Sequence, residues 1–310
     1  MLPWPAKADV LRSIQDILQA DTARLNTALE LGTATARIEV QCLLQQTLKV
    51  TRSHLLAHPE QILNDDQDST YARMLQRRLN GEPIAHILGE REFFGLNFLV
   101  TPDTLIPRPE TELLVELALQ RIPSPPTPLP HAGEGGRQAG RGYAFRVLDL
   151  GTGSGAIALS IAFSRPDIEM VAVDASEAAL QVARENARRL EVSNTSLLQS
   201  DWFSALDGQR FDLIVSNPPY VASGDLHLAQ GDVRFEPLSA LVSGPDGLDD
   251  IRLIVSQARS FLGDGAWLML EHGFDQAKAV RELLKSEFTE VFSAKDIAGI
   301  ERVSGGMRPK

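Results

Sequence analysis

The residues best suited to chemistry are the tetrapeptide Asn217-Pro218-Pro219-Tyr220, which follows the apolar, strand-like run 211–216. Two consecutive prolines remove two backbone donors and stiffen the turn. Asn217 offers an amide oxygen, Pro218 a carbonyl outside the sheet pairing, and Tyr220 an aromatic face. These groups suit a planar NH2 group, which needs two acceptors for its hydrogens and a ring against its plane.

A second candidate is the glycine-rich turn that directly follows the apolar run 146–150. It consists of Gly151, Thr152, Gly153, Ser154 and Gly155. Glycine at every second position permits a tight turn and lets a ligand approach the backbone closely. The spacing is G-x-G-x-G and differs from the dinucleotide pattern G-x-G-x-x-G.

Polar residues also end the next two strand-like runs. Asp174 is placed to accept hydrogen bonds from both hydroxyls of a ribose, and with the glycine turn it indicates an adenosine-bearing cofactor, either NAD or S-adenosylmethionine. A structural alternative makes Asp174 the start of the helix that follows Ser176. Asp201 and Trp202 can contact an adenine by hydrogen bonding and stacking, or Trp202 is a partly buried core aromatic.

These candidates need elements to position them, and strand-like and helical patterns alternate from residue 146 onward. The strand-like runs are almost wholly apolar, which predicts a parallel sheet covered by helices on both faces. Ligands of such sheets bind at the carboxyl ends of the strands, where the candidate residues lie.

The remainder of the chain divides into further parts. Residues 1–85 carry apolar residues at helical spacing, which predicts a small helical domain, with one helix over 69–79 entered after the polar cluster 65–69. A bridging hairpin and linker is expected over 86–109, with a short strand at 104–106.

The sheet domain is expected over 110–310. Within it, a Pro-rich and then Gly-rich stretch at about 123–144 indicates a flexible surface insertion, because such a composition buries little apolar surface.

Charge and composition restrict the function. The 310 residues include 30 Lys+Arg and 41 Asp+Glu, a net charge of −11. Residues 1–85 carry 9 basic and 10 acidic groups, a net charge of −1, whereas residues 147–310 carry 15 and 24, a net charge of −9. An acidic surface repels phosphate backbones and disfavours a nucleic-acid substrate.

The cysteine and histidine residues and the lengths of the apolar runs exclude further classes of protein. One cysteine, Cys42, allows neither an intramolecular disulfide nor a Cys-cluster zinc site. His54 and His58 have helical metal-ligand spacing but no third ligand nearby, so no metal is expected. No run is apolar enough for a membrane span and the N-terminus does not read as a signal peptide, so a cytoplasmic protein is expected.

The tetrapeptide and the upstream glycine turn together resemble the amino-group methyltransferases that use S-adenosylmethionine. Within that set, residues 81–310 resemble the release-factor glutamine methyltransferases, the HemK/PrmC family. The resemblance rests on GEPIAHILGEREFFG, IPRPETE, DLGTGSGAIAL, SDWF, SNPPY, RFEP and EHG. The helical domain in front matches that family's layout, and the insertion at 123–144 departs from it.

The resemblance implies an α/β fold with a doubly wound, mostly parallel, seven-stranded Rossmann-like methyltransferase sheet, preceded by a small all-helical domain for substrate recognition. It implies S-adenosyl-L-methionine as the cofactor and N5-methylation of the glutamine in the Gly-Gly-Gln motif of peptide-chain release factors. We further expect a monomer that contacts neither nucleic acid directly nor a membrane.

The resemblance also assigns roles to residues. The implied catalytic residues are Asn217 and Pro218. The implied cofactor-binding residues are Gly151, Thr152, Gly153, Ser154, Gly155, Asp174, Asp201, Trp202 and Asn217. The implied substrate-binding residues are Asn217, Pro218, Pro219 and Tyr220.

Two alternatives come from other classes. A DNA or RNA adenine N6-methyltransferase shares the tetrapeptide, because adenine also presents a planar NH2 group, but it needs a basic groove. The basic pairs at 77–78 and 188–189 are too small for one. A non-catalytic cofactor-binding adaptor leaves the tetrapeptide without a purpose. If the substrate is a release factor, whose loop works against RNA and is therefore basic, an acidic face would steer it to the site.

Overall fold

The computed structural model describes residues 12–124 and 144–310, so the expected insertion lies outside the described residues except at its ends. The chain forms two compact units. The first comprises Met1–Gly89 and Ala229–Phe235, and the second comprises Glu90–Leu228 and Glu236–Lys310. This division differs from the sequence-based one at 85 and 109, because residues 86–88 belong to a helix of the first unit and 90–109 belong to the second.

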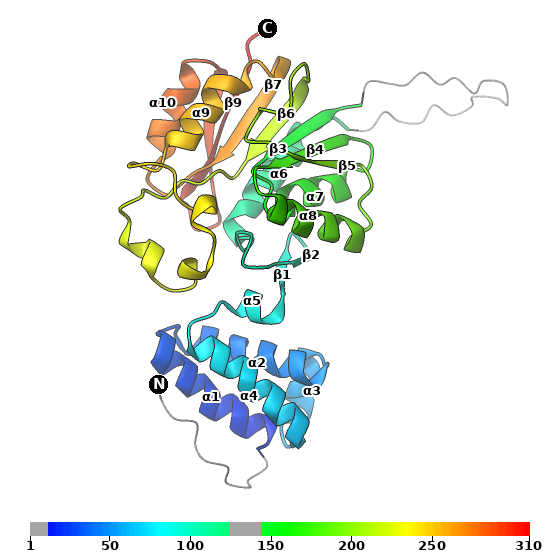
Figure 1. Ribbon diagram of the computed structural model, residues 1–310, viewed down its shortest axis with the longest axis vertical. Coiled ribbons are helices and arrows are strands. Elements are labelled where there is room, and N and C mark those ends of the chain that lie inside the picture. Colours follow the sequence, from blue (N-terminus) through cyan, green and yellow to red (C-terminus); the bar gives the residue numbers. More distant parts are fainter. Residues whose placement is uncertain (1–11, 125–143) are drawn as a thin grey trace, which may run out of the picture. The chain divides into compact units, whose positions relative to one another are not determined.

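The first unit is helical, as expected. Its helices are α1 (Ile14–Leu29), α2 (Thr33–Leu48), α3 (Arg52–Ala57), α4 (Asp65–Leu79) and α5 (Ile84–Leu88) (Figure 1). α1 begins in a capping box between Ser13 and Asp16. α4 begins in another, between Asn64 and Gln67, so the polar cluster 65–69 forms its first turn and the prediction that the helix starts at 69 was wrong.

A buried arginine explains why the segment Ala229–Phe235 belongs to the first unit. Arg78 of α4 is 1% exposed and its Nε donates to Glu39 Oε2 of α2 at 2.7 Å. Its Nη1 donates to Asp232 Oδ1 at 3.0 Å. Since an unpaired buried charge is strongly unfavourable, Arg78 keeps both carboxylates as partners, and its pairing with Asp232 ties the segment to the helices.

The second unit opens with an antiparallel hairpin of β1 (Glu90–Phe93) and β2 (Leu96–Leu99). Phe94 and Gly95 form its turn with φ angles of 53° and 74°, a pattern that matches the twist of paired strands. No strand forms at 104–106, contrary to the prediction, because the Ile106 N–H donates to the Glu236 carboxylate at 2.9 Å.

The core of the second unit is a seven-stranded sheet in the order β5-β4-β3-β6-β7-β9-β8. Its strands are β3 (Arg146–Leu150), β4 (Glu169–Asp174), β5 (Thr195–Gln199), β6 (Phe211–Ser216), β7 (Leu262–Glu271), β8 (Thr289–Lys295) and β9 (Glu301–Met307). The first five in this order are parallel, and β9 is antiparallel to both of its neighbours. The predicted doubly wound, mostly parallel sheet is confirmed.

Helices cover both faces of the sheet (Figure 1). They are α6 (Glu112–Arg121), α7 (Ala156–Ser164), α8 (Glu177–Arg189), α9 (Asp249–Ala258) and α10 (Ala277–Lys285). Short 3-10 turns lie at η1 (Pro109–Thr111), η2 (Leu226–Ala229), η3 (Val233–Phe235) and η4 (Leu238–Ala240). None of the helices in the described ranges is long and apolar enough to cross a membrane.

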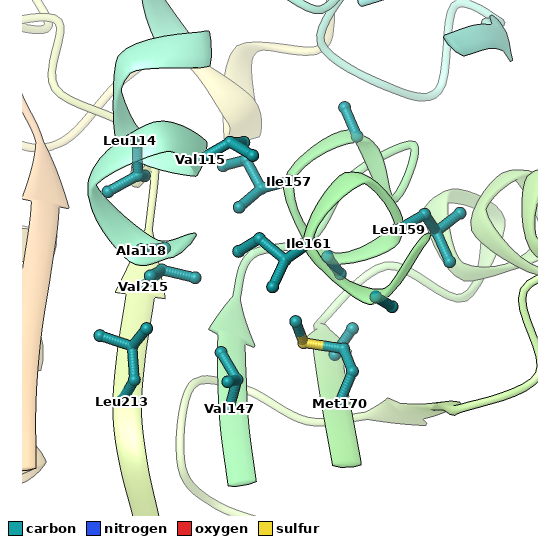
Figure 2. Close-up of a cluster of buried hydrophobic side chains, with 14 of the residues drawn as sticks. Leu114, Val115, Ala118, Val147, Ile157, Leu159, Ile161, Met170, Leu213 and Val215 are labelled. Carbon is teal, nitrogen blue, oxygen red and sulfur yellow. The ribbon is translucent and has the colours of Figure 1, made fainter. Parts of the chain in front are cut away.

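Alternate residues of the central strands enter different cores. Val147 and Leu213 face α6 and α7, as Figure 2 shows with Ile157 and Ile161 packed above the strands. Their neighbours in sequence, such as Leu148 and Ile214, join the cluster that contains residues of α9 and α10. Because both faces of the central strands β3, β4, β6 and β7 are covered, apolar residues occupy most of their consecutive positions, with exceptions such as the buried Asp149.

Candidate active site

One cavity of about 300 Å³ opens at the carboxyl ends of the parallel strands, within the second unit. Its size falls in the range typical of small-ligand sites. Among the residues singled out from the sequence, it is lined by Gly151, Thr152, Gly153, Ser154, Asp174, Asp201, Trp202, Asn217 and Pro219. Gly155, Pro218 and Tyr220 are not among the lining residues.

The glycine turn is held against the neighbouring strand. Gly151 and Gly153 have φ angles of 70° and 57°, which glycine adopts without strain. The Thr152 N–H donates to the Val173 carbonyl at 2.9 Å, and the Gly153 N–H donates to Asp174 Oδ2 at 2.9 Å. The turn and the end of β4 therefore form one rigid wall of the cavity.

The position of Asp174 is compatible with both interpretations made from the sequence. Its Oδ1 accepts the Ser176 N–H at 2.8 Å, which supports the entry to α8, while Ser176 itself is the N-cap. The same carboxylate lines the cavity. Burial raises the pKa of Asp174, and the N–H groups of Ser176 and Gly153 oppose that rise. Carboxylate oxygens have further lone pairs, which remain available to ribose hydroxyls.

Trp202 likewise combines packing and exposure to the cavity. It lies in the left-handed region at φ 46°, and its carbonyl accepts the Ser200 hydroxyl at 2.8 Å. A Cβ at Gly151 would lie 3.5 Å from its ring, so the indole packs directly on the glycine turn. The ring also contacts the core cluster on the α9 and α10 face.

The tetrapeptide divides between the cavity and the protein interior. Asn217 is half-buried and its Nδ2 donates to Thr111 Oγ1 at 3.3 Å. Pro218 is buried. Tyr220 points its hydroxyl to Glu271 Oε1 at 3.4 Å, and burial raises its pKa above the ordinary value. Tyr220 is thus a supporting residue of the wall, and the cavity surface comes from Asn217 and Pro219.

Sequence reasoning missed one wall of the cavity. It is built by the segment 103–111, which overlaps the motif IPRPETE at 106–112 and contributes Arg108 and Thr111. Arg108 pairs with the fully buried carboxylate of Glu236, and Glu236 belongs to the segment RFEP. The motif resemblance was the available signal, but no pattern of residue types assigned these side chains to the site.

The parallel sheet, the glycine turn and the polar cavity at the strand ends together indicate the class of protein to which the chain belongs. The Methyltransferase small domain family matches residues 140–233. A solved methyltransferase from Pyrococcus furiosus has the same fold, with a TM-score of 0.51 and 18% identity over 77% of this chain and 100% of that chain. The chain is a Rossmann-like methyltransferase.

The helical unit and close relatives specify the family. The PrmC N-terminal domain family matches residues 16–89. A release factor glutamine methyltransferase of Escherichia coli (strain K12) is 46% identical over 87% of this chain and 91% of its own length. One from Burkholderia pseudomallei is 48% identical over 94% and 97%. The chain belongs to the release factor glutamine methyltransferase family.

Proposed function

We propose that this protein methylates N5 of the glutamine side chain in the Gly-Gly-Gln motif of peptide-chain release factors, with S-adenosylmethionine as the methyl donor. The observation that carries the proposal is that Asn217 lines the same cavity as the glycine turn and Asp174. An amide held by Asn217 and a nucleoside held by Asp174 would therefore meet in one cavity. The choice of substrate in this proposal is inferred from the family to which the chain belongs.

The chain's residues fit the proposed cofactor. Gly151 and Gly153 bring backbone to the cavity surface without side chains, Asp174 offers carboxylate oxygens to a ribose, and Asp201 with Trp202 offers a polar edge and a ring to adenine. Thr152 and Ser154 complete the turn. Gly155 would contribute by keeping the turn close to α7. When bound, S-adenosylmethionine supplies a methyl group on a positively charged sulfur, which becomes a neutral thioether as the methyl group leaves.

The protein has to compensate for a poor nucleophile. The lone pair of an amide nitrogen is delocalised into its carbonyl. Hydrogen bonds from the NH2 group to Asn217 Oδ1 and to the carbonyl of Pro218, a residue that follows Asn217 but does not line the cavity, would orient that lone pair toward the methyl group and favour a pyramidal nitrogen. The nitrogen would form its bond to the methyl carbon as the carbon–sulfur bond breaks, and would then release its proton to solvent, because the methylated nitrogen is acidic. Catalysis rests mainly on positioning and on exclusion of water.

The partners follow from the same proposal. The substrate is a protein that works in translation, so the protein acts in the cytoplasm. We propose that it acts as a monomer and contacts neither nucleic acid directly nor a membrane, with the helical unit recognising the release factor.

Labelled S-adenosylmethionine tests the assignment. The purified protein should transfer label to a bacterial release factor, and peptide mapping should place it on the Gly-Gly-Gln glutamine. Adenine-containing DNA and RNA should remain unlabelled; label only in nucleic acid would show an adenine methyltransferase instead.

Asn217→Ala adds a test of the site. It should lower turnover by about a hundredfold or more, as removal of a hydrogen-bonding group from a transition-state site does, with a smaller change in cofactor affinity. The matched control is Asn97→Ala, which removes an exposed asparagine of β2 and should retain turnover. Equal losses of turnover and cofactor affinity in Asn217→Ala would mean that Asn217 serves chiefly as a cofactor ligand.

A further inference from the structure

We propose that Thr111 is a positioning residue for the methyl transfer: its hydroxyl holds the side-chain amide of Asn217 so that Oδ1, not Nδ2, faces the substrate glutamine. The buried Glu271 and Tyr220 support this arrangement from behind. The inference rests on the function proposed above, because it concerns how the acceptor amide is oriented.

The orientation of Asn217 matters because the two ends of a carboxamide have nearly the same shape and opposite hydrogen-bonding character. With Oδ1 toward the cavity, Asn217 accepts a hydrogen from the substrate NH2 group. With Nδ2 there, two NH2 groups would face each other. Since shape does not distinguish the two states, a hydrogen-bond partner on the other side must do so.

Thr111 is that partner. Asn217 Nδ2 donates to Thr111 Oγ1 at 3.3 Å, and both residues line the cavity. Thr111 is only 4% exposed, so water does not compete freely for its hydroxyl. The Thr111 hydroxyl can accept from Asn217 while its own hydrogen points toward another acceptor. Glu271 is the candidate for that acceptor.

Glu271 is the candidate acceptor for the hydroxyl hydrogen of Thr111. It is fully buried, and burial raises its pKa to about 7, while hydrogen bonding from Thr111 and Tyr220 acts in the opposite direction. The Tyr220 hydroxyl donates to Glu271 Oε1 at 3.4 Å, and in its ionised form Glu271 only accepts hydrogen bonds, so it would draw the hydroxyl hydrogen of Thr111 toward itself as well. The Thr111 oxygen is then left as an acceptor for Asn217.

The fold brings these residues together from three parts of the chain. Ser216 of β6 pairs with Leu270 of β7, so Asn217 and Glu271 are the next residues at the same level of two adjacent parallel strands. Thr111 ends η1, and its N–H donates to the Arg108 carbonyl at 3.1 Å.

Glu236 fixes the segment that carries Thr111. Its carboxylate pairs with Arg108 and accepts the Ile106 N–H at 2.9 Å. Glu236 is 5% exposed, so this anchor is shielded from solvent. The segments IPRPETE and RFEP thereby act together in placing one hydroxyl beside Asn217.

The experiment compares Thr111→Val, which keeps the shape and removes the hydroxyl, with Thr111→Ser, which keeps the hydroxyl. Thr111→Val should lower kcat toward a release factor by about tenfold to a hundredfold, the effect of losing one buried hydrogen bond at the reacting group. The dissociation constant for S-adenosylmethionine and the Tm should change little. Thr111→Ser should recover most of the kcat.

The control is Thr195→Val in β5. It removes a buried hydroxyl that has no hydrogen-bond partner among the described residues, and it should leave kcat unchanged. Wild-type kcat in Thr111→Val, or equal losses in Thr111→Val and Thr111→Ser, would overturn the proposed role.

A second readout does not depend on activity. Solvent exchange of the Asn217 side-chain NH2 group, followed by NMR, should be slow in the wild type and in Thr111→Ser and faster in Thr111→Val. Equal exchange rates in all three proteins would overturn the Thr111–Asn217 contact. If the exchange rates differ as expected but the wild-type protein does not methylate a release factor, the proposed function is contradicted instead.

Discussion

Two buried carboxyl groups near strand ends of the second unit have raised pKa values. Asp149 of β3 is fully buried, and burial raises its pKa to about 7 although the Thr152 hydroxyl donates to its Oδ2 at 2.7 Å. Glu271 of β7 has a pKa raised to about 7 for the same reason. Both groups hold a proton more tightly in the folded protein than in the unfolded chain.

This difference predicts the pH dependence of stability. The unfolded chain has released both protons well below pH 6, whereas the folded protein releases them near pH 7, so the contribution to stability is complete at low pH and is lost as pH rises through 7. Between pH 6.5 and 8.5 each group should lower the free energy of unfolding by about 1 kcal/mol. Urea titrations at the two pH values measure the change.

Asp149→Asn is the informative variant for this effect. It removes one of the two groups, so about half of the decrease between pH 6.5 and 8.5 should disappear, whatever the variant's stability at a single pH. An unchanged pH dependence in Asp149→Asn would show that its carboxyl does not titrate in this range.

At the scale of elements, the start of α7 depends on the absence of a side chain. Gly155 is the N-cap with φ 83°, and a Cβ there would lie 2.9 Å from Leu159 Cδ1 and 3.3 Å from Ala183 Cβ. Gly155 lets α7 and α8 approach each other directly below the glycine turn. Its contribution to the site is thus through the position of the turn, since it does not line the cavity.

Gly155→Ala should therefore destabilise the protein in two ways, by backbone strain and by a steric clash. Gly208→Ala is the matched control, because Gly208 has φ 77° and nothing within 4 Å of the added Cβ. We expect a loss of about 1 kcal/mol in Gly208→Ala from strain alone. Gly155→Ala should lose about 1–3 kcal/mol more from overpacking, measured by urea unfolding. Equal losses would show that the neighbouring side chains move aside at no cost.

Strands with a clear local run of apolar residues could be predicted from the sequence, and strands without such a run could not. The apolar runs that became β3, β4 and β6 are evident because these strands are buried on both faces. β9 contains Gly305 and Gly306, which weaken a strand pattern. They are required by packing, because a Cβ at Gly305 would lie 2.7 Å from the Leu268 carbonyl oxygen and one at Gly306 would lie 2.7 Å from Phe288 Cβ.

At the scale of the whole molecule, the negative charge is concentrated in one part of the chain. Residues 147–310 carry a net charge of −9, whereas residues 1–85 carry −1. If the release-factor loop that works against RNA is basic, the acidic sheet unit would attract it and repel nucleic acid.

Steering of this kind predicts a salt-dependent association rate. Raising the salt concentration from about 50 to 500 mM should slow association with a release factor by about tenfold, because screening shortens the range of the attraction. The dissociation rate should change less. Stopped-flow mixing with a fluorescently labelled release factor separates the two rates. An association rate that does not depend on salt would contradict steering by charge.

The division into units also emerges only at this scale. Residues 229–235 belong to the loop after the tetrapeptide in sequence, but Asp232 pairs with the buried Arg78 of the helical unit. The two residues are separated by 154 positions. No local pattern indicates such a pairing, because it depends on which arginine becomes buried.

Local patterns in the chain were enough to identify the glycine turn, the acidic strand end, the tetrapeptide and the parallel sheet that carries them. These features are encoded by neighbouring residues, through backbone freedom at glycine and proline and through runs of apolar side chains. The supporting network of Thr111, Asn217 and Glu271 is of a different kind, since its members come from η1, the end of β6 and the end of β7. Only folding removes them from water and places them in contact, and both the hydrogen bonds and the raised pKa of Glu271 depend on that burial.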